Sequence, residues 1–292
     1  MGSALTTIGL PVALGIIMLG LGLSLTIGDF ARVLKQPKAV LTALVCQLLI
    51  LPAICFGLVL LFQLPPVLAV GMMMLAASPG GTTANLYSHL FRGDIALNIS
   101  LTAVNSVIAV ITLPMITNFA IMYFQPFDDQ LGLQWAKALE VFAIVLLPVA
   151  LGMLIRRFWP KFADGMDRPV RIASVVILIV VIAGAVASNW NLLVDNFAGL
   201  ALITILFCLI SLAVGYVVPR LLKVGRRQAI AASFEIGIHN ATLAIVIAQT
   251  VLGSVELSLP AAVYGVLMFF IAFGFGFLIR EREPSAEALR LS

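Results

Sequence analysis

Apolar stretches of about 18 or more residues recur along the whole length of this chain. A helix of that length crosses a hydrocarbon core of roughly 30 Å. Only 10% of the 292 residues are charged, whereas soluble domains carry about 25%. The sequence therefore predicts an all-α polytopic membrane protein with about nine transmembrane helices. The predicted spans are 5–27, 39–62, 67–90, 95–123, 137–156, 171–188, 198–219, 228–252 and 259–280.

The positions of the basic residues give these spans an orientation. Every Lys and Arg except Lys137 falls in one set of alternate loops or in the C-terminal tail. Such an excess of positive charge marks the cytoplasmic side of a membrane protein. We therefore expect an external N-terminus, a cytoplasmic tail over 281–292, and the longest loops near 124–136 and 156–170. The net charge of +4 then reflects topology and does not indicate a nucleic-acid partner.

Two predicted spans contain motifs that break a helix. The third span carries "SPGGTT" at 78–83, and the eighth carries "EIGIHN" at 235–240. These two spans run in opposite directions through the membrane. Interrupted helices at corresponding positions of two inverted halves are typical of a transporter site near the bilayer midplane. The chain is thus predicted to be a single transporter domain, 1–292, with inverted halves at about 5–123 and about 137–280.

Glu235 is the acidic residue that lies well within a span. A carboxylate at this depth costs about 2.5–3.5 kcal/mol on insertion scales, so it needs a partner or a wet cavity. Freed carbonyls of a broken helix can bind a small cation together with such a carboxylate. The half-helix that begins after "SPGG" presents free N–H groups, suited to an anion. Cation-coupled anion transport follows from this arrangement, while a packing kink and a Glu satisfied by neighbouring hydroxyls are the alternatives.

The motifs "SPGGTTAN", "RGDIALNISLTAVNS" and "FEIGIHNATLAI" resemble the bile acid:sodium symporter family, and the likeness covers nearly the whole chain. The resemblance implies two crossing, discontinuous helices in a core domain beside a smaller panel domain. It also implies sodium-coupled uptake of a bile acid or another organic anion across an inner (plasma) membrane. The expected partners are Na⁺, the organic anion and the lipid bilayer, with no cofactor beyond Na⁺ as coupling ion.

The resemblance also implies a role for particular residues. One sodium ion would lie near Asn85, Asn98, Thr102 and Glu235. A second would lie near Gln47, Glu235, His239 and the carbonyls of Ile236 and Ile238. The substrate cavity would be faced by Thr82, Thr83 and Asn240.

Three positions depart from the family pattern. Relatives often carry serine where this chain has Ala84 and Asn98, which leaves a workable oxygen set for the first sodium. Well-known relatives carry glutamine where this chain has His239. A neutral imidazole offers a nitrogen, which suits sodium poorly, and a protonated one repels it. The hypotheses are a weakened second cation site, a proton in place of that ion, or unchanged sodium coupling.

An intramembrane enzyme and a passive channel are the two alternative classes of function. An intramembrane enzyme would use Glu235 and His239 as an acid–base or metal pair. Zinc needs about three protein ligands, yet the other histidine, His89, is predicted near the cytoplasmic edge. A passive channel also suits polar groups at the midplane, and counterflow would distinguish a carrier from it. A non-enzymatic symporter is the principal prediction.

Overall fold

The structure, a computed structural model, describes residues 10–124, 135–188 and 190–280, except for some side chains of 135–185. The first part of the chain forms α2 (Leu10–Ser24), α3 (Ile27–Arg32), α4 (Pro37–Val45), α5 (Leu51–Phe62), α6 (Pro66–Ala77), α7 (Thr83–Leu90) and α8 (Ile95–Phe124). The second part forms α9 (Trp135–Phe158), α10 (Pro160–Ser188), α11 (Trp190–Leu221), α12 (Arg226–Gly237), α13 (Ala241–Val246) and α14 (Leu259–Ile279). The predicted tail 281–292 and residues 5–9 of the first predicted span lie outside this description.

The described residues confirm an all-α chain with several helices suited to a membrane. Four helical stretches are long and apolar enough to cross one, namely Pro37–Phe62, Ile95–Phe124, Trp190–Leu221 and Glu256–Ile279. A bent pair, Pro11–Ser24 with Ile27–Lys35, passes the same test as a unit. These stretches correspond to the predicted spans 39–62, 95–123, 198–219 and 259–280, and the count of nine spans stays a prediction.

The loop predicted near 156–170 is wrong. The helix α9 continues to Phe158, and α10 begins directly afterwards at Pro160. Proline favours the first turn of a helix, because its fixed φ suits that position and its missing N–H would be unpaired there anyway. The charged residues of this stretch therefore lie on helix surfaces, although their number had indicated a loop.

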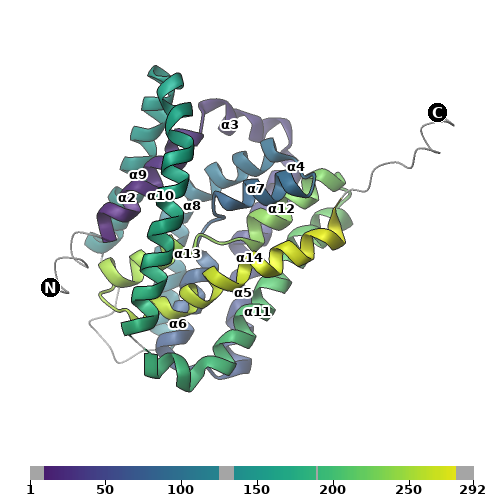
Figure 1. The fold of residues 1–292 in the computed structure, drawn as a ribbon. Coiled ribbons are helices and arrows are strands. Elements are labelled where there is room, and N and C mark those ends of the chain that lie inside the picture. The colour runs from purple at the N-terminus through teal and green to yellow at the C-terminus, as the bar shows by residue number, and fades with distance from the viewer. Residues whose placement is uncertain (1–9, 125–134, 189, 281–292) are drawn as a thin grey trace.

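Helices α2, α9 and α10 pack together along one flank of the molecule (Figure 1). Two glycines allow α2 and α9 to approach closely. A Cβ at Gly22 would overlap the backbone of Val149, and a Cβ at Gly152 would lie 2.5 Å from the carbonyl oxygen of Leu19. Small residues bring membrane helices together in this way. The other helices form a second group, in which α11 packs against α12 and α14, and α6 packs against α8.

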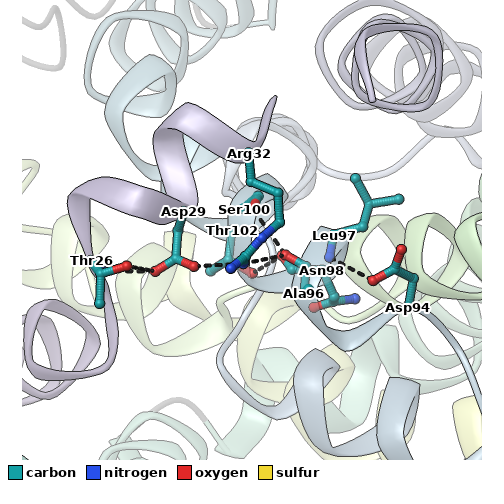
Figure 2. A network of polar contacts seen from close by, with 9 residues as sticks. All are labelled: Thr26, Asp29, Arg32, Asp94, Ala96, Leu97, Asn98, Ser100 and Thr102. Atoms are coloured by element: carbon teal, nitrogen blue, oxygen red, sulfur yellow. Dashed lines mark hydrogen bonds and ion pairs between the residues drawn. The ribbon is translucent and has the colours of Figure 1, made fainter. Parts of the chain in front are cut away.

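A sharp bend separates α2 from α3, with an angle of 65° between the two helices. The backbone N–H and the hydroxyl of Thr26 both donate to the Asp29 carboxylate, each at 2.7 Å (Figure 2). Arg32 forms an ion pair with the other oxygen of Asp29 at 2.8 Å and reaches the carbonyl of Ala96 on α8. The bend thus turns α3 away from α9 and α10 and attaches it to α8.

Candidate functional site

The two motifs that predicted broken helices do interrupt helices, between α6 and α7 and between α12 and α13. The two breaks lie against each other as a short antiparallel pairing. The N–H of Gly81 donates to the carbonyl of Ile238, and the N–H of Asn240 donates to the carbonyl of Pro79, both at 2.8 Å. Lipid offers no hydrogen-bond partner to a broken helix. The crossing of the two segments therefore satisfies backbone groups that each break sets free.

Glu235 lies in the last turn of α12, fully buried beside this crossing. Its carboxylate accepts hydrogen bonds from the Thr102 hydroxyl at 2.6 Å and from the Asn105 amide at 3.4 Å, and Gly80 approaches it closely. Within the described ranges no Lys or Arg pairs with it. A buried carboxylate surrounded by neutral donors leaves a charge that a small cation can balance.

Three amide oxygens accompany this carboxylate. The amide nitrogen of Asn98 donates to the Ser88 hydroxyl and to the carbonyl of Ala231, both at 2.8 Å. Its oxygen is buried and, within the described residues, has no hydrogen-bond partner. The side-chain oxygens of Asn85 and Asn105 are also buried and lack a hydrogen-bond partner among the described residues. Buried polar groups are normally paired, so these three oxygens are acceptors left available for a hard cation, and that of Asn105 belongs to a residue that contacts Glu235.

The start of α8 positions Asn98 and Thr102. Asp94 caps the helix by accepting the N–H of Leu97 at 3.0 Å, and Asn98 and Thr102 follow within two turns (Figure 2). The other oxygen of Asp94 accepts from Gln36 at 3.2 Å, which joins this end of α8 to the start of α4. The position of the polar face of α8 is thus set by a cap and by a contact from another helix.

A second polar cluster surrounds the carbonyl oxygen of Ser78. The amide nitrogen of Gln47 donates to it at 3.0 Å, and the Nδ1 atom of His239 lies 3.1 Å from it. Because a carbonyl only accepts, Nδ1 carries the proton in the neutral ring. The ring stacks on Phe207, with centroids 5.5 Å apart, and meets Tyr264 edge-on. The Oε1 of Gln47 and the Nε2 of His239 are buried and lack a hydrogen-bond partner among the described residues.

Ile236 and Ile238 belong to the end of α12, where the helix breaks. Both are fully buried. The carbonyl of Ile238 already accepts the N–H of Gly81, with one lone pair remaining. The residues predicted to bind the second sodium therefore lie around the end of α12. Two of them, Gln47 and His239, direct a side-chain nitrogen to the carbonyl oxygen of Ser78.

Thr82, Thr83 and Asn240 lie together on a cavity of about 360 Å³. The cavity is also walled by apolar side chains of α2, α10 and α14, among them Ile17, Ile182 and Phe269. The side-chain oxygen of Asn240 accepts the N–H of Leu243 at 3.0 Å and so caps α13.

A larger cavity of about 500 Å³ shares Thr82 and Thr83 with the first. It extends along α7 past Asn85 to Arg156, near the end of α9. Behind Asn240, on the side of Ser106 and Leu243, a third cavity has a volume of only about 10 Å³. The space around the crossing is therefore much wider toward the end of the molecule where Arg156 lies.

Sequence reasoning did not assign Asn105, Gly80 or Tyr264 to the site. Asn105 could have been found, because it shares one face of α8 with Asn98 and Thr102 at helical spacing. Tyr264 donates to the carbonyl of Gly237 at 2.8 Å from a distant helix, and no local pattern in the sequence signals such a contact.

Comparison with known proteins identifies the family. The profile of the Sodium Bile acid symporter family matches residues 11–196. The chain is 30% identical, over 259 residues, to a protein of Arabidopsis thaliana described as probable sodium/metabolite cotransporter BASS1, chloroplastic. It is 26% identical, over 263 residues, to a protein of Bacillus subtilis described as uncharacterized sodium-dependent transporter YocS. The chain belongs to the sodium bile acid symporter family.

The extent of these matches differs between relatives. The match covers 87% of this chain and 62% of the plant protein, and 88% of this chain and 78% of the Bacillus protein. The P3 protein of Homo sapiens is 30% identical over 220 residues, which are 74% of this chain and 45% of that protein. Because the family is one of transporters, membership in it decides against the intramembrane enzyme.

Proposed function

We propose that the protein is a sodium-coupled symporter that carries an organic anion into the cell. The observation that carries this proposal is the fully buried carboxylate of Glu235, which bonds to Thr102 and Asn105 next to the crossing of two broken helices. Family membership and the names of the relatives, which include sodium/metabolite cotransporters, support it.

The first cation is proposed to bind Asn85, Asn98, Thr102 and Glu235, with Asn105 added from the structure. These residues supply amide, hydroxyl and carboxylate oxygens, the ligands that hard cations prefer. The Oδ1 atoms of Asn85, Asn98 and Asn105 have no other partner among the described residues. The second cation is proposed for Gln47, Glu235, His239 and the carbonyls of Ile236 and Ile238, with a lower affinity because His239 replaces an oxygen by a nitrogen.

The organic anion is proposed to bind beside Thr82, Thr83 and Asn240. The helix α7 begins at this point, so the positive end of its dipole and the hydroxyls of Thr82 and Thr83 favour a carboxylate. The apolar walls of the 360 Å³ cavity suit the body of the substrate. A bile acid or a smaller carboxylate with an apolar part is the proposed class.

Transport is proposed to proceed by alternating access, in a chain of nine spans with two inverted halves. Helices α2, α9 and α10 would form the panel and the other helices the core. The basic loops would face the cytoplasm, with the N-terminus outside. The wide cavity near Arg156 then corresponds to a state open to the cytoplasm.

Coupling to a proton through His239 is the second candidate function. The buried and unpartnered Nε2 of this residue favours it. Transport measured with and without sodium at each of several pH values separates the two candidates, because a sodium symporter retains its sodium dependence at each pH. A passive channel would show no counterflow of labelled anion.

The test of the proposed function is the thermal stability of the purified protein in NaCl, with KCl and choline chloride as controls. A ligand that binds only the folded state at 100 times its Kd stabilises by about 2.7 kcal/mol. We expect a sodium-selective rise in Tm that Glu235→Ala abolishes and that the exposed Glu256→Ala retains. Equal responses to the three salts in the wild-type protein would contradict the proposal.

A further inference from the structure

Arg156 lies near the end of α9 and lines the 500 Å³ cavity that leads away from the crossing. One nitrogen of its guanidinium, Nη1, donates to the carbonyl of Leu23 at 3.1 Å and to the carboxylate of Asp164 at 3.0 Å. The side chain of Arg156 is 29% exposed and that of Asp164 is 67% exposed. Leu23 lies in α2, directly before the bend, so the arginine is held at a defined place in the cavity wall.

The other edge of this guanidinium is free for a ligand. Arginine has five N–H donors, and the two on Nη1 account for the Leu23 and Asp164 contacts. The donors on Nε and Nη2 have no partner within the part of the chain that the structure describes. Two parallel N–H groups on one edge match the two oxygens of a carboxylate.

The charge of Arg156 also sets it apart in this region. Among the described residues that line the two larger cavities, it is the one Lys or Arg. The cavities meet at Thr82 and Thr83, which the proposed function assigns to the anion. An anion that leaves these threonines toward the wide end of the cavity therefore meets this guanidinium, beside which the carboxylate of Asp164 also lines the cavity.

We propose that the Nε–Nη2 edge of Arg156 is a second carboxylate subsite, which receives the anion between the crossing and the open end of the cavity. This inference rests on the proposed function, because it assumes that an anion occupies the cavity. It narrows the substrate class to compounds with a carboxylate on a compact apolar body. The carboxylate of Asp164 binds Nη1 of the same guanidinium and repels an anion at the neighbouring edge, and so lowers the affinity of the subsite.

The test measures the affinity of benzoate, with the uncharged benzamide as control, by thermal stability of the full-length protein in NaCl. Arg156→Gln should weaken benzoate binding about ten-fold or more, because it removes a charge-assisted pair of hydrogen bonds. Arg157→Gln is the matched control, since Arg157 is the next residue of α9, has the same charge and lines neither cavity. Asp164→Asn retains the Leu23 contact and should strengthen benzoate binding several-fold.

The proposal is overturned if benzoate does not stabilise the wild-type protein more than benzamide, or if Arg156→Gln responds as Arg157→Gln does. If Arg156→Gln does not fold, unchanged affinity in Asp164→Asn overturns it equally. The sodium response is measured on the same samples and separates the two proposals. A sodium-selective rise with no Arg156 effect rejects the subsite alone, whereas an Arg156 effect without a sodium response rejects sodium coupling alone.

Discussion

Gly80 lies so close to Glu235 that a Cβ on Gly80 would overlap both the carboxylate and the carbonyl oxygen of Glu235. Gly80 belongs to the break between α6 and α7, and Glu235 to the end of α12. The proposed cation site is therefore built where both broken helices meet. A change in either segment is transmitted directly to the charged group.

Gly80→Ala should remove sodium-selective stabilisation and lower the stability of the protein, because the added methyl group displaces Glu235 from its donors. Overpacking of this kind costs about 1–3 kcal/mol. The measurement is Tm in NaCl and in KCl. Gly81→Ala is the control, since a Cβ there meets its neighbours at 3.5–3.6 Å, an ordinary contact. Equal effects of the two substitutions would refute the role of this close approach.

Thr102→Val should weaken sodium binding about ten-fold while leaving the fold intact. The valine has a similar shape but lacks the hydroxyl that donates to Glu235 at 2.6 Å, and a hydrogen bond to a charged group is worth about 1.5–3 kcal/mol. Thr112→Val is the matched control on the same helix, because the Thr112 hydroxyl bonds only to its own helix, at Ile108. The affinity is read from Tm as a function of NaCl concentration.

His239→Gln should raise the sodium affinity, because a hard cation prefers an oxygen ligand to a nitrogen. Glutamine supplies an oxygen where the ring of His239 now presents Nε2, and its amide can keep the contact to the carbonyl of Ser78. The sodium dependence of uptake should also become steeper, because a second ion then binds at working concentrations. Wild-type and variant protein with the same sodium dependence, at each pH tested, would exclude His239 from cation binding.

Asp29→Ala should lower stability by about 1–3 kcal/mol, because the buried carboxylate accepts from Thr26 twice and its removal leaves these donors unpaired. Arg32 also loses the partner that holds it near α8. Thermal denaturation in KCl measures the effect without a sodium contribution. Asp195→Ala, an exposed position on α11, should change Tm little. If Asp29→Ala and Asp195→Ala changed Tm equally, Asp29 would not stabilise the bend between α2 and α3.

The class of fold and the centre of the site could be predicted from the sequence, because both depend on local patterns. A bilayer requires apolar stretches of a certain length, and each predicted stretch corresponds to helix, from Pro37–Phe62 to Leu259–Ile279. Proline and glycine within "SPGGTT" and the polar "EIGIHN" predict helix breaks at the positions where the structure has them. Glu235 was conspicuous because a charge deep in a span is costly.

The tertiary structure decided how these parts meet. The contacts of Glu235 with Thr102, Asn105 and Gly80 depend on how α12, α8 and the break between α6 and α7 pack together. The same is true of the free edge of Arg156, which exists because Leu23 and Asp164 occupy the other edge. The length of an apolar stretch and the presence of helix-breaking residues are properties of about one helix. The sequence by itself therefore determined the helices and their breaks. Hydrogen bonds between groups more than a hundred residues apart form only when the helices cross, and they determined the site.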